Sequence, residues 1–274
     1  VGSTTALQLC APGGASCTAL TPPFIVGSDI DLVATVSAAG FGAATGTVEF
    51  RRGYVNAANP GTLLGSASAS LSGTTTVTGK ATLALRSTST PKSAEALPAD
   101  PTAYAITAHF LGGGSYSASQ SSASNLTVNP VVTSISADAT KATGTCTVAT
   151  GSIILGEPVV LTAIIIGAAL PGGRTIGGTV EFRDASAANA LLGTATVVPN
   201  LAGGSATLCV YTSPTGVGAG THAVSASFVS TSADYASSNT TSNASLVVEK
   251  ITTATAVTLG ATTVAEGGSL ALSA

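Results

Sequence analysis

Apolar and small polar residues alternate along many short stretches of this chain. In residues 30–36 and in residues 104–110, for example, alternate side chains form an apolar set. A period of two places alternate side chains on one face of a β-strand. The side chains predicted to point inward on these two strands are Ile30, Leu32, Ala34, Val36, Tyr104, Ile106, Ala108 and Phe110. No stretch shows an amphipathic helical repeat with capping residues, so the pattern predicts an all-β protein.

Turn-forming residues separate the predicted strands at short intervals. Examples are Ala39-Gly40, Asn59-Pro60-Gly61, Ser72-Gly73, Gly112-Gly113-Gly114 and Pro171-Gly172-Gly173. Glycine, proline and asparagine suit the backbone angles that tight turns require. About seven short strands in roughly 120 residues are typical of an immunoglobulin-like β-sandwich. A β-barrel built from the same strands is the alternative.

The sequence also repeats internally. Gly46-Thr47-Val48-Glu49-Phe50-Arg51 recurs as Gly178-Thr179-Val180-Glu181-Phe182-Arg183, and further segments recur around it in the same order. These pairs are 30–34 with 159–163, 63–65 with 191–193, 80–83 with 205–208, 106–110 with 224–228, and 126–128 with 246–248. The offset varies from 118 residues (106 to 224) to 132 residues (46 to 178). The differences in length therefore lie between the matched segments, where loops absorb insertions at little cost.

The repeat predicts two complete domains and the beginning of a third. Residues 1–129 form the first Ig-like domain and residues 130–250 the second. A third copy begins after Lys250, because residues 270–274 match residues 159–163. Residues 251–274 provide too few strands to bury a core alone. Either the array continues beyond them, or they complete a sandwich by pairing with another chain.

The repeated segments resemble the bacterial Ig-like domain repeat family, group 3 type, of large surface proteins and adhesins. The resemblance rests on residues 178–182, 191–195, 204–208, 219–224, 234–238 and 244–248 and on their counterparts in the first copy. It implies a rod-like array of tandem Ig-like domains that act as spacers and share no catalytic residues. The first copy departs from the family in a long insert, Arg86–Thr102, where Pro91, Pro98 and Pro101 replace a short turn. We expect this insert to make a contact specific to its copy.

Composition and charge exclude several kinds of partner. Hydrophobic residues make up 45% of the chain, enough for two cores, whereas charged residues make up only 8%, against about a quarter on average. The Lys and Arg residues are scattered, with Arg51-Arg52 as their only adjacent pair, and the net charge is −3. The sequence therefore predicts no binding of nucleic acid and none of an anionic membrane. The longest dense apolar stretch, Val159–Ile166, is far shorter than the ~20 residues that span a bilayer.

Four cysteines divide evenly between the two copies. This division favours one disulfide per domain, Cys10 with Cys17 and Cys146 with Cys209, in an oxidising compartment. A metal site is the competing interpretation. However, the Cys-x6-Cys spacing has no neighbouring histidine and matches no zinc pattern.

A calcium site at a domain junction is a further alternative. Calcium binds clusters of oxygen ligands, which Glu157, Asp138 or Glu249 would supply. No Asp-x-Asp-x-Asp run accompanies these residues. We therefore expect neither a metal ion nor a cofactor.

The sequence gives little support for catalysis. The two histidines, His109 and His222, fall at different repeat positions and are expected on the surface. Asp29 and Asp31 flank the inward Ile30 and are expected to face the solvent together. No Gly-x-Ser-x-Gly, Walker or His-Glu-x-x-His motif occurs. We expect a protein that is not an enzyme.

The predicted architecture favours a structural function. An odd number of strands lets the chain enter each sandwich at one end and leave at the other, so tandem copies line up as a rod. The links at Asn129-Pro130 and Glu249-Lys250 have almost no Gly or Ser, which predicts limited bending. We expect a stalk or filament segment of an extracellular or cell-surface protein. Its partners would be further Ig-like domains of the same chain or other copies in a fibre.

An adhesin module is the second hypothesis. It would bind carbohydrate or a protein of a host or neighbouring cell through its loops, with exposed aromatic side chains. The chain has no tryptophan and five tyrosines, of which Tyr54 is the best exposed candidate. Tyr54 and the insert prolines Pro91, Pro98 and Pro101 are the predicted contact residues. A third hypothesis is an accessory module of a larger secreted enzyme.

Overall fold

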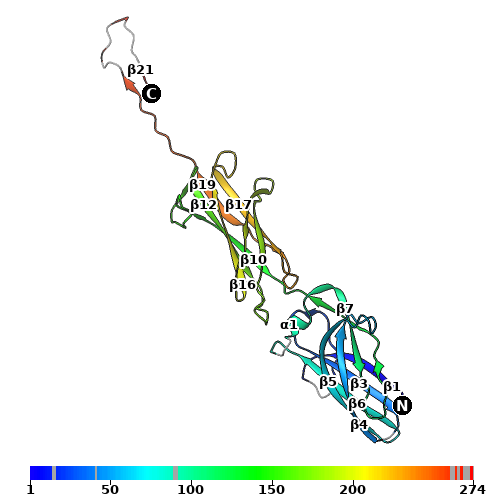
Figure 1. The fold of residues 1–274 in the computed structure, drawn as a ribbon. Helices are drawn as coiled ribbons and strands as arrows, with labels where there is room; N and C mark the ends of the chain where they lie inside the picture. Colours follow the sequence, from blue (N-terminus) through cyan, green and yellow to red (C-terminus); the bar gives the residue numbers. More distant parts are fainter. Residues whose placement is uncertain are drawn as a thin grey trace.

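The computed structural model describes residues 1–13, 17–40, 42–88, 92–259, 263, 266–267 and 272–273. Two elongated β-sandwiches follow one another along a common axis, and a thin extended segment leads away from the second (Figure 1). The helix α1 (Ser93–Ala96) is a single turn in the insert of the first copy. No helix in the described ranges is long and apolar enough to cross a membrane.

The first sandwich is built by nine strands that share one hydrogen-bonded network. They are β1 (Ser3–Cys10), β2 (Phe24–Ile25), β3 (Ile30–Ala39), β4 (Gly42–Arg52), β5 (Thr62–Gly73), β6 (Thr76–Leu85), β7 (Asp100–Phe110), β8 (Ser119–Gln120) and β9 (Ser124–Asn129). Their order is β1-β3-β6-β5-β4-β7-β9-β2, with β8 beside β7. β5 joins the two layers, because it pairs with β4 along its length and with β6 at Ser72 and Thr78.

The second sandwich contains two separate sheets. Its strands are β10 (Ser134–Lys141), β11 (Ile153–Ile154), β12 (Pro158–Ile166), β13 (Gly178–Asp184), β14 (Ala190–Thr196), β15 (Val198–Asn200), β16 (Gly203–Tyr211), β17 (Gly220–Ser230), β18 (Ser238–Asn239) and β19 (Ala244–Glu249). One sheet has the order β10-β12-β16-β15, and the other has the order β11-β19-β17-β13-β14, with β18 beside β17. The two faces enclose a core instead of closing into a barrel.

In both sandwiches the first strand is divided between the two layers. β1 pairs antiparallel with β3, whereas β2 pairs in parallel with the last strand, β9. β10 and β11 repeat this arrangement with β12 and β19. The shared topology and the sandwich layers are those of an immunoglobulin-like fold. The fold class predicted from the sequence, a rod-like array of tandem Ig-like β-sandwiches, is confirmed.

The cores follow the alternation seen in the sequence. Ile30, Leu32, Ala34 and Val36 on β3 are all 0% exposed. The largest fully buried side chains are Phe50, Phe110, Phe182 and Phe228, two in each sandwich. Burial of one such side chain contributes about 1.5–3 kcal/mol. Tyr104, predicted to point inward, is only half-buried, and its ring lies 5.0 Å from the guanidinium carbon of Arg52.

The repeated Leu-Leu-Gly sequence marks the same backbone irregularity in both copies. The pairing of β4 with β5 shifts after Phe50, and that of β13 with β14 shifts after Phe182. At Gly65, a Cβ would lie 2.8 Å from Leu83, and at Gly193 it would lie 2.7 Å from Leu208. Both glycines are therefore required where the bulged strand approaches the opposite layer.

Beyond the second sandwich, the chain forms only one short strand pair in the described residues. β20 (Thr258–Leu259) pairs antiparallel with β21 (Leu272–Ser273). Residues 250–257 are exposed and contain no strand. Leu270, Ala271 and Ala274, which the repeat assigns to the third copy, lie outside the described residues.

The expectation that Asp29 and Asp31 are both solvated was wrong. Asp31 is only 7% exposed, forms an ion pair with Arg86 and accepts a hydrogen bond from the Gly13 N–H at 3.2 Å. Asp29 accepts one from the Ser87 N–H at 2.7 Å. The start of the insert thus lies over the first residues of β3 and covers Asp31 there.

Candidate functional site at the junction of the two sandwiches

The linker between the sandwiches is bonded to the structure on both sides. Four residues separate the end of β9 from the start of β10. The N–H of Val131 donates to the Asp234 carbonyl at 2.8 Å, and the Val131 carbonyl accepts from the Ala236 N–H at 2.9 Å. Just before the linker, the Val26 N–H donates to the Asn129 carbonyl at 2.9 Å. A linker whose backbone groups are paired has little freedom to bend.

The insert of the first copy folds onto the end of its own sandwich. Leu97 is 0% exposed, and Ser93 Oγ donates to the Gly27 carbonyl at 3.0 Å. The hydroxyl of Tyr104 donates to the Pro98 carbonyl at 3.0 Å. These contacts hold the insert at the end of the first sandwich that faces the second.

Asp234 connects the insert directly to the second sandwich. Its Oδ1 accepts a buried hydrogen bond from the Ala99 N–H at 3.0 Å, across the junction. Its Oδ2 forms an ion pair with the guanidinium of Arg174. The side chain of Asp234 is 8% exposed, and a carboxylate so buried is stable only when it is paired and hydrogen-bonded. Both of its oxygens have such a partner.

The loop between β12 and β13, residues 167–177, also approaches the first sandwich, near Gly27 and Glu95. A Cβ at Gly27, where φ is +82°, would lie 2.8 Å from Leu170 Cδ2. A Cβ at Gly172, where φ is +88°, would lie 2.9 Å from Glu95 Oε1. The positive φ values favour glycine at both positions, and each glycine lies close to a side chain of the other sandwich.

Tyr235 supports this loop from beneath. It is 4% exposed, and its hydroxyl lies 3.3 Å from the carbonyl of Arg174 and 3.4 Å from that of Ala168. Burial raises the pKa of the Tyr235 hydroxyl above its ordinary value of 10.0. The hydroxyl is thus neutral and available as a donor to this loop.

The first sandwich has the same backbone hydrogen bonds at its own start but lacks the carboxylate of Asp234. The amino group of Val1 donates to the Ser115 carbonyl at 2.6 Å, and the Val1 carbonyl accepts from the Ser117 N–H at 2.8 Å. Val131 makes the corresponding bonds with Asp234 and Ala236. Serine therefore stands where the second copy has Asp234. The bond across the junction depends on features specific to these two copies.

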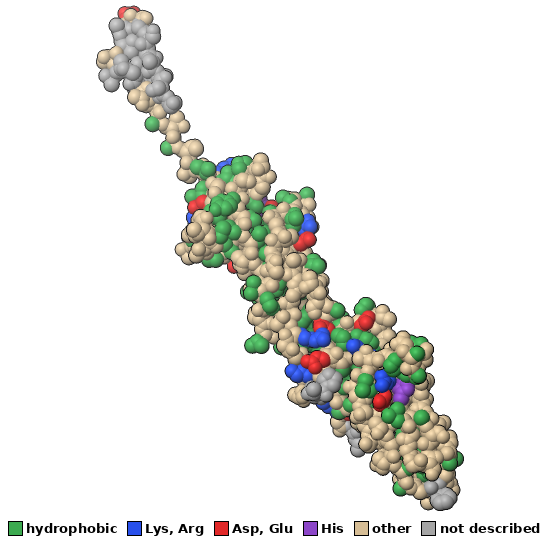
Figure 2. Space-filling view, viewed as in Figure 1, with side chains coloured by type: hydrophobic (Ala, Val, Ile, Leu, Met, Phe, Trp, Pro, Cys, Tyr) green, Lys and Arg blue, Asp and Glu red, His purple; other side chains and the backbone are tan. Residues whose placement is uncertain are grey.

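A shallow crevice of about 740 Å³ runs along the junction. Its lining is uncharged: Ile25, Val26, Gly27, Ser28, Ser87, Val131, Val132, Ala168, Ala169, Leu170 and Pro171. Acidic and basic side chains lie beside the junction, and further ones lie on the upper part of the second sandwich and beside the histidine of the first (Figure 2). The junction thus combines apolar contact with a charged margin.

The predicted contact residues lie in different surroundings. Tyr54 is half-buried, and its ring lies 4.0 Å from that of His109, tilted by 57°. Pro98 is half-buried beneath Tyr104, Pro101 is exposed, and Pro91 lies outside the described residues. The insert that carries the prolines contacts the second sandwich through Ala99. The sequence alone did not indicate this partner.

One disulfide lies in each sandwich. Cys10, 1% exposed at the end of β1, is joined to Cys17. Cys146, in the connection between β10 and β11, is joined to Cys209 on β16. No free cysteine occurs in the described chain. The second disulfide ties a long connection to a central strand of its sheet.

The expectation that both histidines lie on the surface was wrong for His222. Its side chain is 14% exposed, its Nδ1 lies 2.5 Å from Asp184 Oδ2, and its Nε2 lies 2.9 Å from the Gly218 carbonyl. Asp184 also accepts from the Ser186 hydroxyl at 2.5 Å. Both ring nitrogens are occupied by structural partners. The cluster closes the end of the second sandwich that faces away from the first.

Of the acidic residues considered for calcium, Glu157 is bonded to other groups of the protein. Both carboxylate oxygens of Glu157 lie 2.9 Å from Lys141 Nζ, and Oε2 also accepts from the Ile154 N–H at 2.8 Å. The Ile154 N–H, followed by Lys141, lowers the pKa of Glu157. Among the described residues, no group of three His, Cys, Asp or Glu side chains is placed to hold a metal ion.

The fold and the junction define a class, a tandem pair of Ig-like sandwiches with a hydrogen-bonded interface between them. No protein-family model matches the chain, and no curated protein matches it in sequence. Red sea bream transglutaminase is similar in structure at 14% identity and a TM-score of 0.32, over 90% of this chain and 31% of that chain. The C-terminal domain of the Streptococcus agalactiae AgI/II polypeptide BspA is similar at 9% identity and a TM-score of 0.29, over 90% and 99%.

A third similar structure is the α2-macroglobulin of E. coli, at 10% identity and a TM-score of 0.23, over 98% of this chain and 18% of that chain. The chain thus spans less than a third of the transglutaminase and less than a fifth of the macroglobulin. Likenesses this weak carry no argument about what the chain does. The functional argument therefore depends on the junction.

Proposed function

We propose that this chain is a stiff spacer segment of an extracellular or cell-surface protein, without catalytic activity of its own. The observation that carries the proposal is the buried bond from the Ala99 N–H to Asp234, which crosses from one sandwich to the other. Neighbouring domains move relative to one another unless their interface is large and hydrophobic. Here the uncharged lining of the junction crevice accompanies the buried bond. A spacer needs a fixed distance between its ends, and a bonded junction provides it.

The disulfides support the extracellular part of the proposal. Disulfides persist in oxidising compartments and are rare in the reducing cytosol. Each sandwich contains one, and no free thiol accompanies them in the described residues. Membership of the bacterial Ig-like repeat family is likewise a proposal, supported by the order of the repeated segments.

The distance between the two sandwiches tests the stiffness of the junction. Spin labels would be attached to unnatural amino acids at Ser70 and Thr207, which are both exposed. Pulsed electron paramagnetic resonance should then give one narrow distribution of the distance between the two labels. Unnatural amino acids leave the disulfides intact. A chain with four glycines inserted after Asn129 gives the broad distribution of a flexible joint. If the unaltered chain gave the same breadth, it would not be a stiff spacer.

A second candidate function, an adhesin, is favoured by one feature of the first sandwich. The ring of Tyr54 packs at a tilt against that of His109, and the adjacent Val55 is 68% exposed. The second copy has Ser227 at the position of His109. A glycan array and a cell-binding assay with Tyr54→Ala as the control variant would test this role. Equal binding by the variant would exclude Tyr54 as the contact.

A further inference from the structure

The two disulfides differ in how far they are exposed to solvent. Cys146 is exposed and Cys209 is half-buried, whereas Cys10 is 1% exposed and Cys17 is half-buried. Thiol–disulfide exchange begins when a thiolate reaches one of the two sulfurs, so its rate depends on access. The disulfide of the second sandwich is therefore the more accessible of the two.

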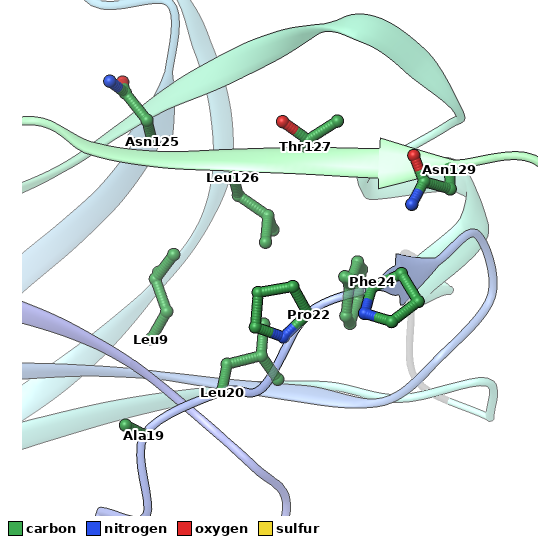
Figure 3. A pocket seen from close by; sticks show the side chains of 10 residues that line it. Leu9, Ala19, Leu20, Pro22, Phe24, Asn125, Leu126, Thr127 and Asn129 are labelled. Atoms are coloured by element: carbon green, nitrogen blue, oxygen red, sulfur yellow. The ribbon is translucent and has the colours of Figure 1, made fainter.

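The first disulfide lies in a packed part of its sandwich. The Leu20 N–H donates to the Leu9 carbonyl at 3.1 Å. Figure 3 shows Leu9, Ala19 and Leu20, which lie on either side of this disulfide in sequence, along an apolar groove of about 380 Å³ beside β9. Leu9 and Leu20 also pack against the core. Cys10 is enclosed by the same packing.

The turn that carries Cys146 has hydrogen bonds of its own. The Cys146 N–H donates to the Thr143 carbonyl and the Thr143 N–H donates to the Thr147 carbonyl, both at 2.8 Å. The hydroxyl of Tyr211 donates to the Gly144 carbonyl at 3.0 Å and connects the turn to the end of β16. The turn therefore stays attached to the sandwich when the disulfide is open.

The backbone of Cys146 has a conformation that suits glycine. Its φ is +61°, in the left-handed region, where the Cβ of any other residue is crowded. Hairpin turns of three residues commonly have glycine at their left-handed position. A cysteine there is held at a conformational cost, and disulfides that are strained or exposed are the labile ones.

We propose that Cys146 is the site at which a small thiol in solution reacts with the folded protein. The thiolate forms a bond to Cys146 Sγ, and the bond between Cys146 and Cys209 breaks. Cys209 leaves with the electron pair as a thiolate and takes a proton from water. A second thiol then attacks the mixed disulfide, joins the first thiol and releases Cys146 as a thiol. Two small thiols are thus oxidised to one disulfide, and the protein disulfide is reduced to two thiols.

The surroundings of Cys209 direct the attack to Cys146. Cys209 lies on β16 directly opposite Val160 of β12, and Val160 is only 2% exposed. This part of the outer sheet face is therefore covered. Cys146 belongs to the exposed turn outside it, so a thiol that approaches from the solvent reaches the sulfur of Cys146 first.

The reaction should weaken one sandwich and not the other. The disulfide joins residues 63 apart in the second sandwich, and its opening returns conformational entropy to the unfolded state of that sandwich alone. Thiols in the surroundings thus lower the stability of one part of the spacer. This consequence rests on the proposed function, whereas the reaction at Cys146 does not.

Pulse alkylation of the folded full chain tests the proposal. Glutathione is the probe thiol, N-ethylmaleimide stops the reaction at set times, and peptide mass spectrometry identifies the modified cysteines. We expect Cys146 and Cys209 to be modified at least ~10-fold faster than Cys10 and Cys17. In the first products glutathione should be attached to Cys146 and the alkyl group to Cys209. In urea, where both disulfides are accessible, the difference in rate should disappear.

Cys10→Ser combined with Cys17→Ser is the matched control, because this variant keeps only the second disulfide. It should react at the rate of the unaltered chain, and near-ultraviolet circular dichroism should show that the reacted chain stays folded. Equal rates for the two disulfides in the folded chain would overturn the proposal. Glutathione attached mainly to Cys209, or loss of the folded signal on reaction, would overturn it as well, even if the junction proved stiff.

The outcome is separable from that of the spacer test. Alkylation measures access to a sulfur and does not depend on the distance between the sandwiches. Selective reaction at Cys146 in a chain with a flexible junction would leave the thiol site in place and remove only its meaning for a spacer.

Discussion

At the scale of single residues, Asp234 concentrates the interaction between the two sandwiches. One oxygen accepts from the Ala99 N–H of the first sandwich, and the other is paired with Arg174 of the second. A buried donor without an acceptor costs about 1–3 kcal/mol. The carboxylate therefore matters more for what its removal would leave unpaired than for its own charge.

Asp234→Ala should lower the free energy of unfolding by about 1–3 kcal/mol, because it leaves the Ala99 N–H without an acceptor. Urea denaturation monitored by circular dichroism measures the loss. Asp234→Asn is the matched control, since its amide oxygen still accepts from Ala99 while the ion pair with Arg174 is lost. Its effect should be smaller than that of the alanine variant. An alanine variant as stable as the unaltered chain would contradict this assignment.

Asp184 makes the stability of the second sandwich dependent on pH. Burial raises the pKa of Asp184, but hydrogen bonds from Ser186 and His222 outweigh it and hold the pKa below its ordinary value of 3.8. A carboxylate with a lowered folded-state pKa stabilises the fold above its ordinary pKa, and this contribution disappears as the pH falls through the folded-state value. We expect the stability of the second sandwich to fall below pH ~4.

Urea denaturation from pH ~2 to pH ~7 measures this contribution. Asp184→Asn should flatten the acid side of the profile, whereas Asn at the exposed Asp138 should leave it unchanged. Identical profiles for the unaltered chain and the Asp184 variant would show that the carboxylate does not contribute.

The period of two tells which face of a strand a side chain occupies but not what covers that face. Asp31 does lie opposite the inward set of β3, yet Arg86 and the Gly13 N–H cover it. His222 is likewise bonded by Asp184, the last residue of β13, and by the Gly218 carbonyl. Except for Asp184, these partners come from segments between the strands, whose paths no alternation specifies. Residue-scale expectations failed at such positions and succeeded in the cores.

At the scale of elements, the strands were the most predictable part of the molecule. The segments 30–36 and 159–165 lie within β3 and β12, and their inward side chains form the cores. The even division of cysteines pointed to the same two pairs that the structure contains. The single turn of α1 has too few residues for a helical period to emerge. Its contact with the second sandwich also depends on an arrangement of domains that no local pattern encodes.

The two disulfides should differ in their effect on stability. Cys146 and Cys209 are 63 residues apart, whereas Cys10 and Cys17 are 7 apart. The loop-entropy model gives about 4 kcal/mol for the longer loop and about 2 kcal/mol for the shorter one. Replacement of each pair by serine, followed by thermal unfolding of each sandwich, compares them. A larger loss from the shorter loop would mean that strain or residual structure outweighs loop closure.

At the scale of the whole molecule, the two sandwiches form a rod (Figure 1). The sequence predicted this shape from the short linker and from an odd number of strands, which fits the nine strands of the first sandwich but not the ten of the second. It did not predict that the insert of one copy and a loop of the next would meet. Small-angle X-ray scattering should give the profile of two collinear sandwiches for residues 1–250, with a projecting segment beyond them.

The same profile should persist at ~1 M salt, because the junction relies on buried hydrogen bonds and apolar contact that salt screens weakly. Insertion of four glycines after Asn129 provides the bent reference. A profile that changed toward this reference in salt would show that the charged margin, and not the buried bonds, aligns the sandwiches.

The parallel pairing of β2 with β9 has a mechanical consequence. Tension along the rod pulls the chain before Phe24 toward one end and the chain after Asn129 toward the other. Because the two strands run in the same direction, that force slides one along the other instead of peeling them apart. Their hydrogen bonds share the load and must break together, and β11 with β19 reproduces the geometry in the next sandwich. Each sandwich is thereby oriented to resist pulling between its two ends.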